Sequence, residues 1–136
     1  MTDVASHRAH NSDWSEREQI LLRELSAAEK SGDRLGLEVG VYRLALFYSS
    51  WERFEAAVPY WRRGAELTVR STAPDAREFA TYLYNMARLC LIPGGLREEA
   101  RTVLCQAREI FGLHFRSEAQ VLRDVEELLE QIAKGH

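Results

Sequence analysis

The side chains that most often carry catalysis or bind metals are few in this chain, and they form no recognisable set. Cys90 and Cys105 stand inside apolar helical patterns and not in paired metal-ligand motifs. His114 is a lone histidine in a predicted loop, and His7 and His10 lie in a polar N-terminal segment. The PGGL segment at 93–96 lies between two predicted helices, whereas a phosphate-binding loop follows a strand. We therefore expect no enzyme activity, no metal site and no cofactor.

Composition indicates one ordinary globular domain. The chain has 136 residues, of which 46% are hydrophobic and 29% charged. Its net charge of −3 argues against a general nucleic-acid binder. The first residues lack the apolar region of a secretory signal, and no apolar run reaches the roughly 18 residues of a membrane span. Two free thiols suit a reducing compartment, so we expect a cytoplasmic protein without membrane insertion.

Apolar residues recur at spacings of three and four in six segments, which predicts an all-α chain. The expected helices cover about 13–30, 34–49, 52–70, 74–91, 96–111 and 117–134. Residues 1–12 carry no such period and are expected to form a flexible arm. Gly32 and Asp33 are suited to end one helix and to cap the next. Gly40 would let a neighbouring helix approach closely.

Two stretches of the chain, 41–67 and 83–110, resemble each other. At an offset of 42 residues, the first half aligns the pairs Val41 and Leu83, Leu44 and Met86, Ala45 and Ala87, and Tyr48 and Cys90. One extra residue, which we assign to the second turn, then raises the offset to 43 and aligns the pairs Ala57 and Ala100, and Trp61 and Leu104. Self-similarity at this period predicts a helical repeat array.

The repeated pattern resembles the tetratricopeptide repeat. In that family the first helix carries large, large, small and aromatic residues, here Val41, Leu44, Ala45 and Tyr48. The second helix carries an aromatic residue, alanine, a second aromatic and a small residue, here Phe54, Ala57, Trp61 and Gly64. The long period is similar to the variety found in kinesin light chains, and the segments LYNMA and EAAVPYWRRGAEL match that variety. Cys90 departs from the pattern, because it stands where the family has an aromatic residue.

The resemblance implies an antiparallel array of helix hairpins, an α-solenoid, in a single domain at 13–134. Full repeats are expected at about 35–70 and 77–112, with a C-terminal capping helix at about 117–134. In this family the first helices of the repeats line a concave groove that holds a peptide or a partner helix. Transferring the groove positions one by one predicts that the site consists of Val39, Tyr42, Arg43, Leu46, Thr81, Tyr84, Asn85 and Arg88.

Each groove residue also has a plainer interpretation. Asn85 matches the asparagine that bonds the ligand backbone in the family, but it could be an ordinary surface amide. Tyr42 and Tyr84 could offer flat contacts to a partner or pack against neighbouring helices. Arg43 and Arg88 could meet an acidic motif, or they could pair with nearby acids. Trp51 and the outer face of the last helix could form a second interface.

These patterns predict a non-catalytic protein–protein interaction module, an adaptor or scaffold for a protein or peptide partner. Two alternatives remain open at this point. One is a structural subunit that associates with itself, for example as a homodimer. The other is a regulatory protein that senses a peptide or a small molecule. Fold-level resemblance alone does not name the partner.

Overall fold

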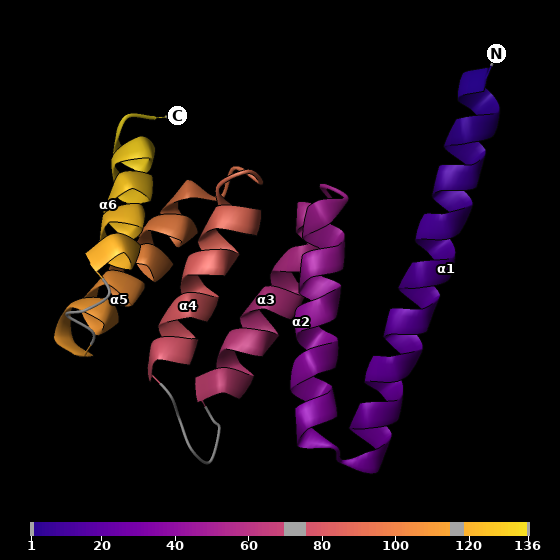
Figure 1. Cartoon of the computed structure of the whole chain (residues 1–136), viewed down its shortest axis with the longest axis horizontal. Helices are drawn as coiled ribbons and strands as arrows, with labels where there is room; N and C mark the ends of the chain where they lie inside the picture. Colours follow the sequence, from indigo (N-terminus) through magenta and orange to yellow (C-terminus); the bar gives the residue numbers. More distant parts are fainter. Residues whose placement is uncertain (1, 70–75, 115–118, 136) are drawn as a thin grey trace.

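The computed structural model describes residues 2–69, 76–114 and 119–135, and the side chains of 14–69, 77–112 and 120–135. These residues form helices and connecting turns, without a strand. The elements are α1 (Thr2–Ser31), α2 (Arg34–Ser50), α3 (Phe54–Val69), α4 (Ala76–Met86), the π-helical segment η1 (Ala87–Leu91), α5 (Arg97–His114) and α6 (Ala119–Ala133). Each helix packs against the next in the sequence, and successive helices run in opposite directions (Figure 1). The predicted all-α helical array is confirmed.

Helix α1 begins at Thr2 rather than near residue 13, where the apolar period starts. Its first turns extend past the end of α2 (Figure 1). Burial of an apolar stripe is what makes a helix visible in a sequence, and a helical extension beyond its neighbours needs no such stripe. The side chains of His7, His10 and His114 and the segment 70–75 between α3 and α4 lie outside the described parts of the chain.

Local signals between α1 and α2 act as predicted. Gly32 has a φ of 71°, the left-handed conformation that ends many helices. Asp33 then caps α2, because its Oδ1 accepts a hydrogen bond from the Gly36 N–H at 3.0 Å. Further along α2, a Cβ on Gly40 would lie 3.5 Å from Cα of Leu25. The missing side chain at Gly40 therefore lets α1 and α2 approach closely.

The centre of the array is an aromatic cluster that joins three helices. Tyr42 of α2, Trp61 of α3 and Tyr82 of α4 have ring centroids 5.3–5.8 Å apart. Trp61 is fully buried, and its Nε1 donates a hydrogen bond to Ser49 Oγ at 2.9 Å. Such ring pairs contribute about 0.5–1.5 kcal/mol each beyond their buried area. This cluster connects the two helix hairpins, α2 with α3 and α4 with α5.

The two hairpin turns have the same backbone hydrogen bonds at an offset of 43 residues. Arg53 N–H bonds Tyr48 O at 2.8 Å, and Leu96 N–H bonds Leu91 O at 2.8 Å. The bonds from Trp51 to Phe47 and from Glu52 to Ser49 recur in the same way from Gly94 to Cys90 and from Gly95 to Ile92. Glu52 and Gly95 both have positive φ, 58° and 81°. Since the turns are equivalent, the extra residue of the second repeat does not lie in its turn.

The extra residue lies instead in η1, which corrects the expectation from the sequence. Ile92 N–H bonds Ala87 O at 2.9 Å, five residues back, so this turn holds one residue more than an α-helical turn. Ala87 still matches Ala45 at an offset of 42, whereas Cys90 now matches Phe47 at 43. Leu91, not Cys90, therefore occupies the place of Tyr48.

Candidate binding groove between α1, α2 and α4

Six of the eight predicted groove residues line one hollow between α2 and α4. We call it the second hollow; its volume is about 780 Å³, and residues of α3 form its floor. The predicted residues that line it are Val39, Tyr42, Arg43, Leu46, Thr81 and Asn85. Arg77, Thr81 and Asn85 recur every four residues along α4, so they share one face of that helix. The floor is formed by Gly64 and Thr68 of α3.

A neighbouring hollow, which we call the first hollow, has a volume of about 730 Å³ and lies between α1, α2 and η1. Its α1 wall carries Ile20 and Glu24, and its opposite wall carries Leu89 of η1. Trp51 also lines it, and packs edge-on against Trp14 with ring centroids 6.1 Å apart. Trp51 therefore covers the end of the hairpin and borders this hollow at the same time.

The two hollows form one continuous surface across α2, because Arg43 and Leu46 line both of them. We call this surface the groove. Large apolar side chains are exposed along it: Ile20 is 52% exposed, Leu35 71% and Val39 40%. Exposed apolar side chains that are contiguous and bordered by polar ones are typical of interaction sites.

Tyr84 and Arg88 line neither hollow. The Arg88 guanidinium lies over the Tyr84 ring, 5.5 Å from its centroid, and Nη2 of Arg88 donates to Asn85 Oδ1 at 3.2 Å. Burial raises the pKa of Tyr84, and Asp124 and Glu127 of α6 raise it further. Tyr84 therefore faces α6, just as Tyr42 faces Tyr82 of α4, but only Tyr42 lines a hollow.

Sequence reasoning missed Tyr82, which lies at the bottom of the second hollow. Its hydroxyl is buried and has no hydrogen-bond partner among the described residues. Burial raises the pKa of this hydroxyl, and the nearby Tyr42 adds to the effect. The ring fits only because position 64 is glycine: a Cβ there would overlap the Tyr82 hydroxyl. The repeat alignment shows a change of residue size at both sides of this contact. Tyr82 aligns with the small Gly40, and Gly64 aligns with the larger Ala107.

Removing the Tyr82 hydroxyl is expected to stabilise the protein. A buried hydroxyl without a partner costs about 1–3 kcal/mol of desolvation, so Tyr82→Phe should raise the free energy of unfolding by roughly 1 kcal/mol. Tyr48→Phe is the matched control with the opposite sign. Tyr48 Oη donates to Glu18 Oε2 at 2.6 Å, so its loss should cost about 1–2 kcal/mol. Urea unfolding of both variants checks the two signs. Equal losses in both would show that the Tyr82 hydroxyl has a partner in solution.

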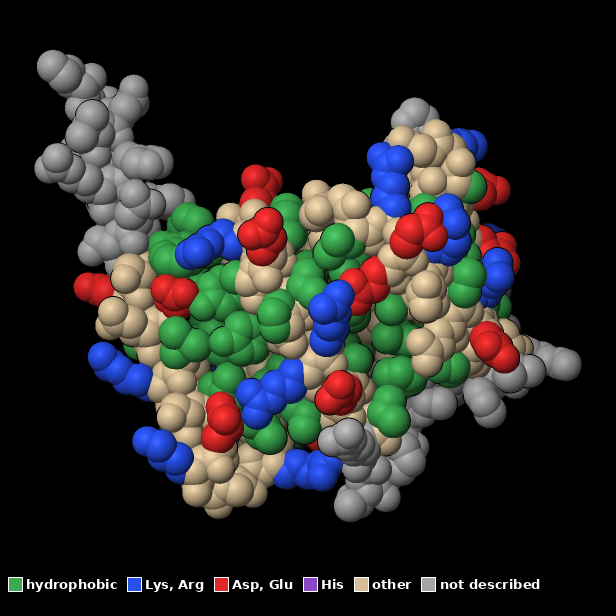
Figure 2. Space-filling model, turned by 180° about the vertical axis from the view of Figure 1, so that it is seen from behind, with side chains coloured by type: hydrophobic (Ala, Val, Ile, Leu, Met, Phe, Trp, Pro, Cys, Tyr) green, Lys and Arg blue, Asp and Glu red, His purple; other side chains and the backbone are tan. Residues whose placement is uncertain are grey.

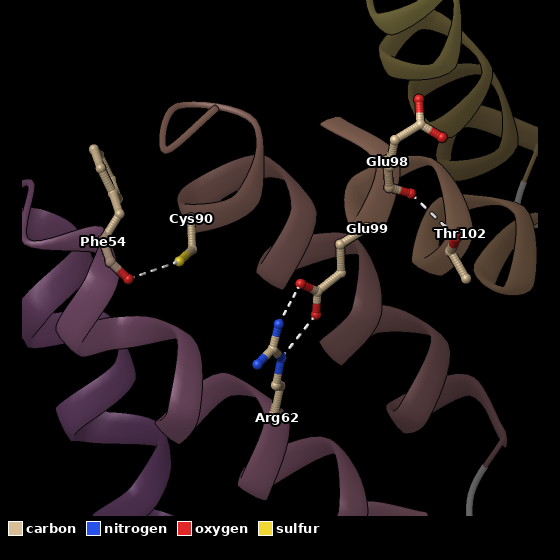
Figure 3. Close-up of polar contacts among 6 residues, drawn as sticks. All are labelled: Phe54, Arg62, Cys90, Glu98, Glu99 and Thr102. Atoms are coloured by element: carbon tan, nitrogen blue, oxygen red, sulfur yellow. Dashed lines mark hydrogen bonds and ion pairs between the residues drawn. The ribbon is translucent and has the colours of Figure 1, made fainter. Parts of the chain in front are cut away.

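Ion pairs fix several arginines to acids that lie far away in the sequence. Arg43 contacts Glu24 of α1 at 3.4 Å. In α3, Arg63 contacts Glu29 at 3.6 Å, and Arg62 makes two contacts with Glu99 of α5, the longer of them 2.9 Å (Figure 3). Acids that stand next to Arg62 and Arg63 in the sequence, Glu55 and Glu66, are not the partners in these pairs. Only the pair of Arg62 and Glu99 joins the two hairpins; the other two join α1 to the first hairpin, and exposed pairs of this kind contribute at most about 1 kcal/mol each.

Helices α3 and α5 form the face of the array that points away from the viewer in Figure 1. Figure 2 shows hydrophobic side chains there between scattered charged ones. A third hollow, of about 490 Å³, lies between α3, α4 and α5. Val69 lines it and is 51% exposed, and it shares no lining residue with the groove. This surface therefore offers control positions for experiments on the groove.

Two observations concern metal binding and thiol chemistry among the described side chains. No group of three or more His, Cys, Asp or Glu in the described part of the chain is close enough to hold a metal ion. Cys90 is buried, its Sγ–H faces the carbonyl of Phe54 at 3.8 Å (Figure 3), and burial raises its pKa to about 11. The thiol is therefore protonated at neutral pH and a poor nucleophile.

Two further findings bear on the class of protein. Within the described residues, every helix is too short or too polar to cross a bilayer. No family model, curated protein or solved structure matches this chain.

Proposed function

We propose that this chain is a non-catalytic protein-interaction module that binds a peptide or helix of a partner protein in the groove. The observation that carries the proposal is the continuity of two apolar hollows across α2, with Ile20, Leu35 and Val39 exposed along them. The proposal takes the chain to be a short array of the tetratricopeptide type. A groove built on packed helices binds at little ordering cost to itself.

The chemistry of the groove supports a peptide over a small polar metabolite. Its walls combine apolar side chains with charges of both signs, Glu24 and Glu38 on one hand and Arg43 and Arg77 on the other. The two hollows, of about 730 and 780 Å³, extend over α1, α2 and α4 and together exceed the roughly 300–1,000 Å³ of a small-molecule pocket. An extended or helical segment with several apolar side chains fits such a surface.

A charge placed in the groove is expected to abolish binding. Val39→Glu puts a carboxylate among the apolar side chains of the second hollow, and Val39 is 40% exposed, so folding should be little affected. We would select binders for the wild-type chain from a displayed library of random 12-residue peptides and measure their affinity by fluorescence anisotropy. Val39→Glu should weaken binding by at least about a hundredfold, as the loss of an interface hot spot does.

Val69→Glu is the matched control, since Val69 is 51% exposed and lines the third hollow. This variant should bind the selected peptides as the wild type does. Equal losses in both variants, or peptides that Val39→Glu binds unchanged, would place the site elsewhere. Light scattering at several protein concentrations tests the alternative that the chain associates with itself. A dimer that Val39→Glu converts to a monomer would mean that the groove holds a second copy of the chain.

A further inference from the structure

The two helix hairpins meet in the middle of the array and leave a hollow on either side of their contact. Helix α3 packs against α4 and η1, and this contact joins the hairpins (Figure 1). On one face of the array the second hollow lies between α2 and α4, and on the opposite face the third hollow lies between α3 and α5. A rotation of one hairpin about the contact between α3 and α4 that opens one hollow therefore closes the other.

An ion pair spans the third hollow. Arg62 of α3 and Glu99 of α5 both line this hollow, and Nε and Nη2 of Arg62 each donate to one oxygen of the Glu99 carboxylate (Figure 3). The Glu99 side chain is 28% exposed, and the hydrogen bond from Arg62 lowers the pKa of its carboxyl. A pair with two parallel contacts fixes orientation as well as distance. The pair therefore holds α3 and α5 at one separation.

On the groove side a contact between two rings allows a small change of angle. Tyr42 of α2 and Tyr82 of α4 line the second hollow, with ring centroids 5.7 Å apart and ring planes tilted by 54°. Aromatic pairs are favourable over centroid separations of about 4.5–7 Å. The rings can therefore stay in contact while the hairpins rotate slightly, whereas the two parallel contacts of the ion pair cannot.

We propose that the ion pair of Arg62 and Glu99 sets the angle between the two hairpins and thereby keeps the second hollow wide enough for a peptide. The two residues line neither hollow of the groove, so they act as positioning residues from the opposite face. The effect on binding rests on the proposed function, whereas the effect on the angle does not.

The test reverses each charge and then exchanges the two. Glu99→Arg and Arg62→Glu each place like charges across the third hollow, which pushes α3 and α5 apart and narrows the second hollow. Each variant should bind the peptides selected on the wild-type chain roughly three- to tenfold more weakly. The exchange of both residues restores an opposite pair and should restore the wild-type affinity to within about twofold. Circular dichroism checks that every variant is folded.

Net charge makes a different prediction, which the same variants exclude or establish. Glu99→Arg raises the net charge and Arg62→Glu lowers it, so an effect of net charge would weaken binding in one variant and strengthen it in the other. Arg101→Glu and Glu98→Arg are the matched controls, since this exposed pair lies within α5 and joins no hairpins. Both controls should bind as the wild type does. Opposite effects of the two reversals, or no recovery in the exchanged variant, would overturn the inference.

A distance measurement tests the hairpin angle without any peptide. Glu66 of α3 and Gln106 of α5 line the third hollow from its two sides, so spin labels on Glu66→Cys and Gln106→Cys report its width. The chain for labelling carries Cys105→Ser, and Cys90 is buried. Electron paramagnetic resonance should show a longer distance in Glu99→Arg and the original distance in the exchanged variant.

The outcomes separate this inference from the proposed function. An unchanged distance in Glu99→Arg would overturn the role of the ion pair and leave the groove intact. If no selected peptide is sensitive to Val39→Glu, the proposed function itself fails, and the distances still decide whether the pair sets the hairpin angle.

Discussion

Deletion of Arg88 is expected to leave the protein cooperatively folded, whereas deletion of Arg101 is expected to abolish its cooperative unfolding transition. Arg88 lies in the π-helical turn, which holds one residue more than the matching turn of α2. Without it, Leu89 would take the place that Leu46 has in the first repeat, and the segment would become an ordinary α-helix. We expect a melting temperature within about 5 °C of the wild type, because every core residue keeps its position.

Helix α5 cannot absorb the deletion of Arg101 in this way, because it is a regular α-helix. In a regular helix one missing residue rotates everything beyond it by about 100°. Residues of α5 that are now buried would turn toward solvent, among them Leu104, Ala107 and Phe111, which are at most 1% exposed. Thermal unfolding followed by circular dichroism at 222 nm compares the two deletions directly. If deleting Arg88 also abolishes the unfolding transition, then the π-helical turn η1 does not arise from the insertion of one residue into an α-helix.

Gly64→Ala is expected to lower the free energy of unfolding by about 2–3 kcal/mol, although alanine is the better helix former. The added Cβ would overlap the Tyr82 hydroxyl and ring. Tyr82 has little freedom to move, since its ring packs against Tyr42 and Trp61. Both Gly64 and Tyr82 line the second hollow, so the same substitution should also weaken peptide binding.

Two controls isolate the contact behind this effect. Gly112→Ala, in helix α5 and with open space around the new Cβ, should stabilise the protein by roughly 0.5–1 kcal/mol. In a Tyr82→Leu background, Gly64→Ala should cost much less than in the wild type, with a coupling of about 2 kcal/mol in urea unfolding. An unchanged cost in that background would assign the effect to helix α3 alone.

The helices and much of the groove follow from short-range patterns in the chain. The six helical segments show three-and-four spacings of apolar residues, and Gly32 and Asp33 mark one boundary with the conformation and the cap that their chemistry favours. Repeat positions on α2 and α4 then placed Val39, Arg43 and Asn85 beside one hollow. These features are readable because they depend on residues within a few turns of one another.

Other features depend on residues that meet only in the folded chain. The sequence alignment paired Tyr48 with Cys90 and so placed the extra residue after Cys90, whereas the backbone hydrogen bonds place it before Cys90, in η1. Tyr82 reaches the groove floor because Gly64 on another helix leaves room for its ring. Arg62 pairs with Glu99, which is 37 residues away, and not with the acids beside it in α3. Arg88 in η1 donates to Asn85 and lies over the Tyr84 ring. Helical periodicity and capping act over a few residues and can be recognised in the chain itself, whereas packing and charge pairing act through space and are decided by the tertiary fold.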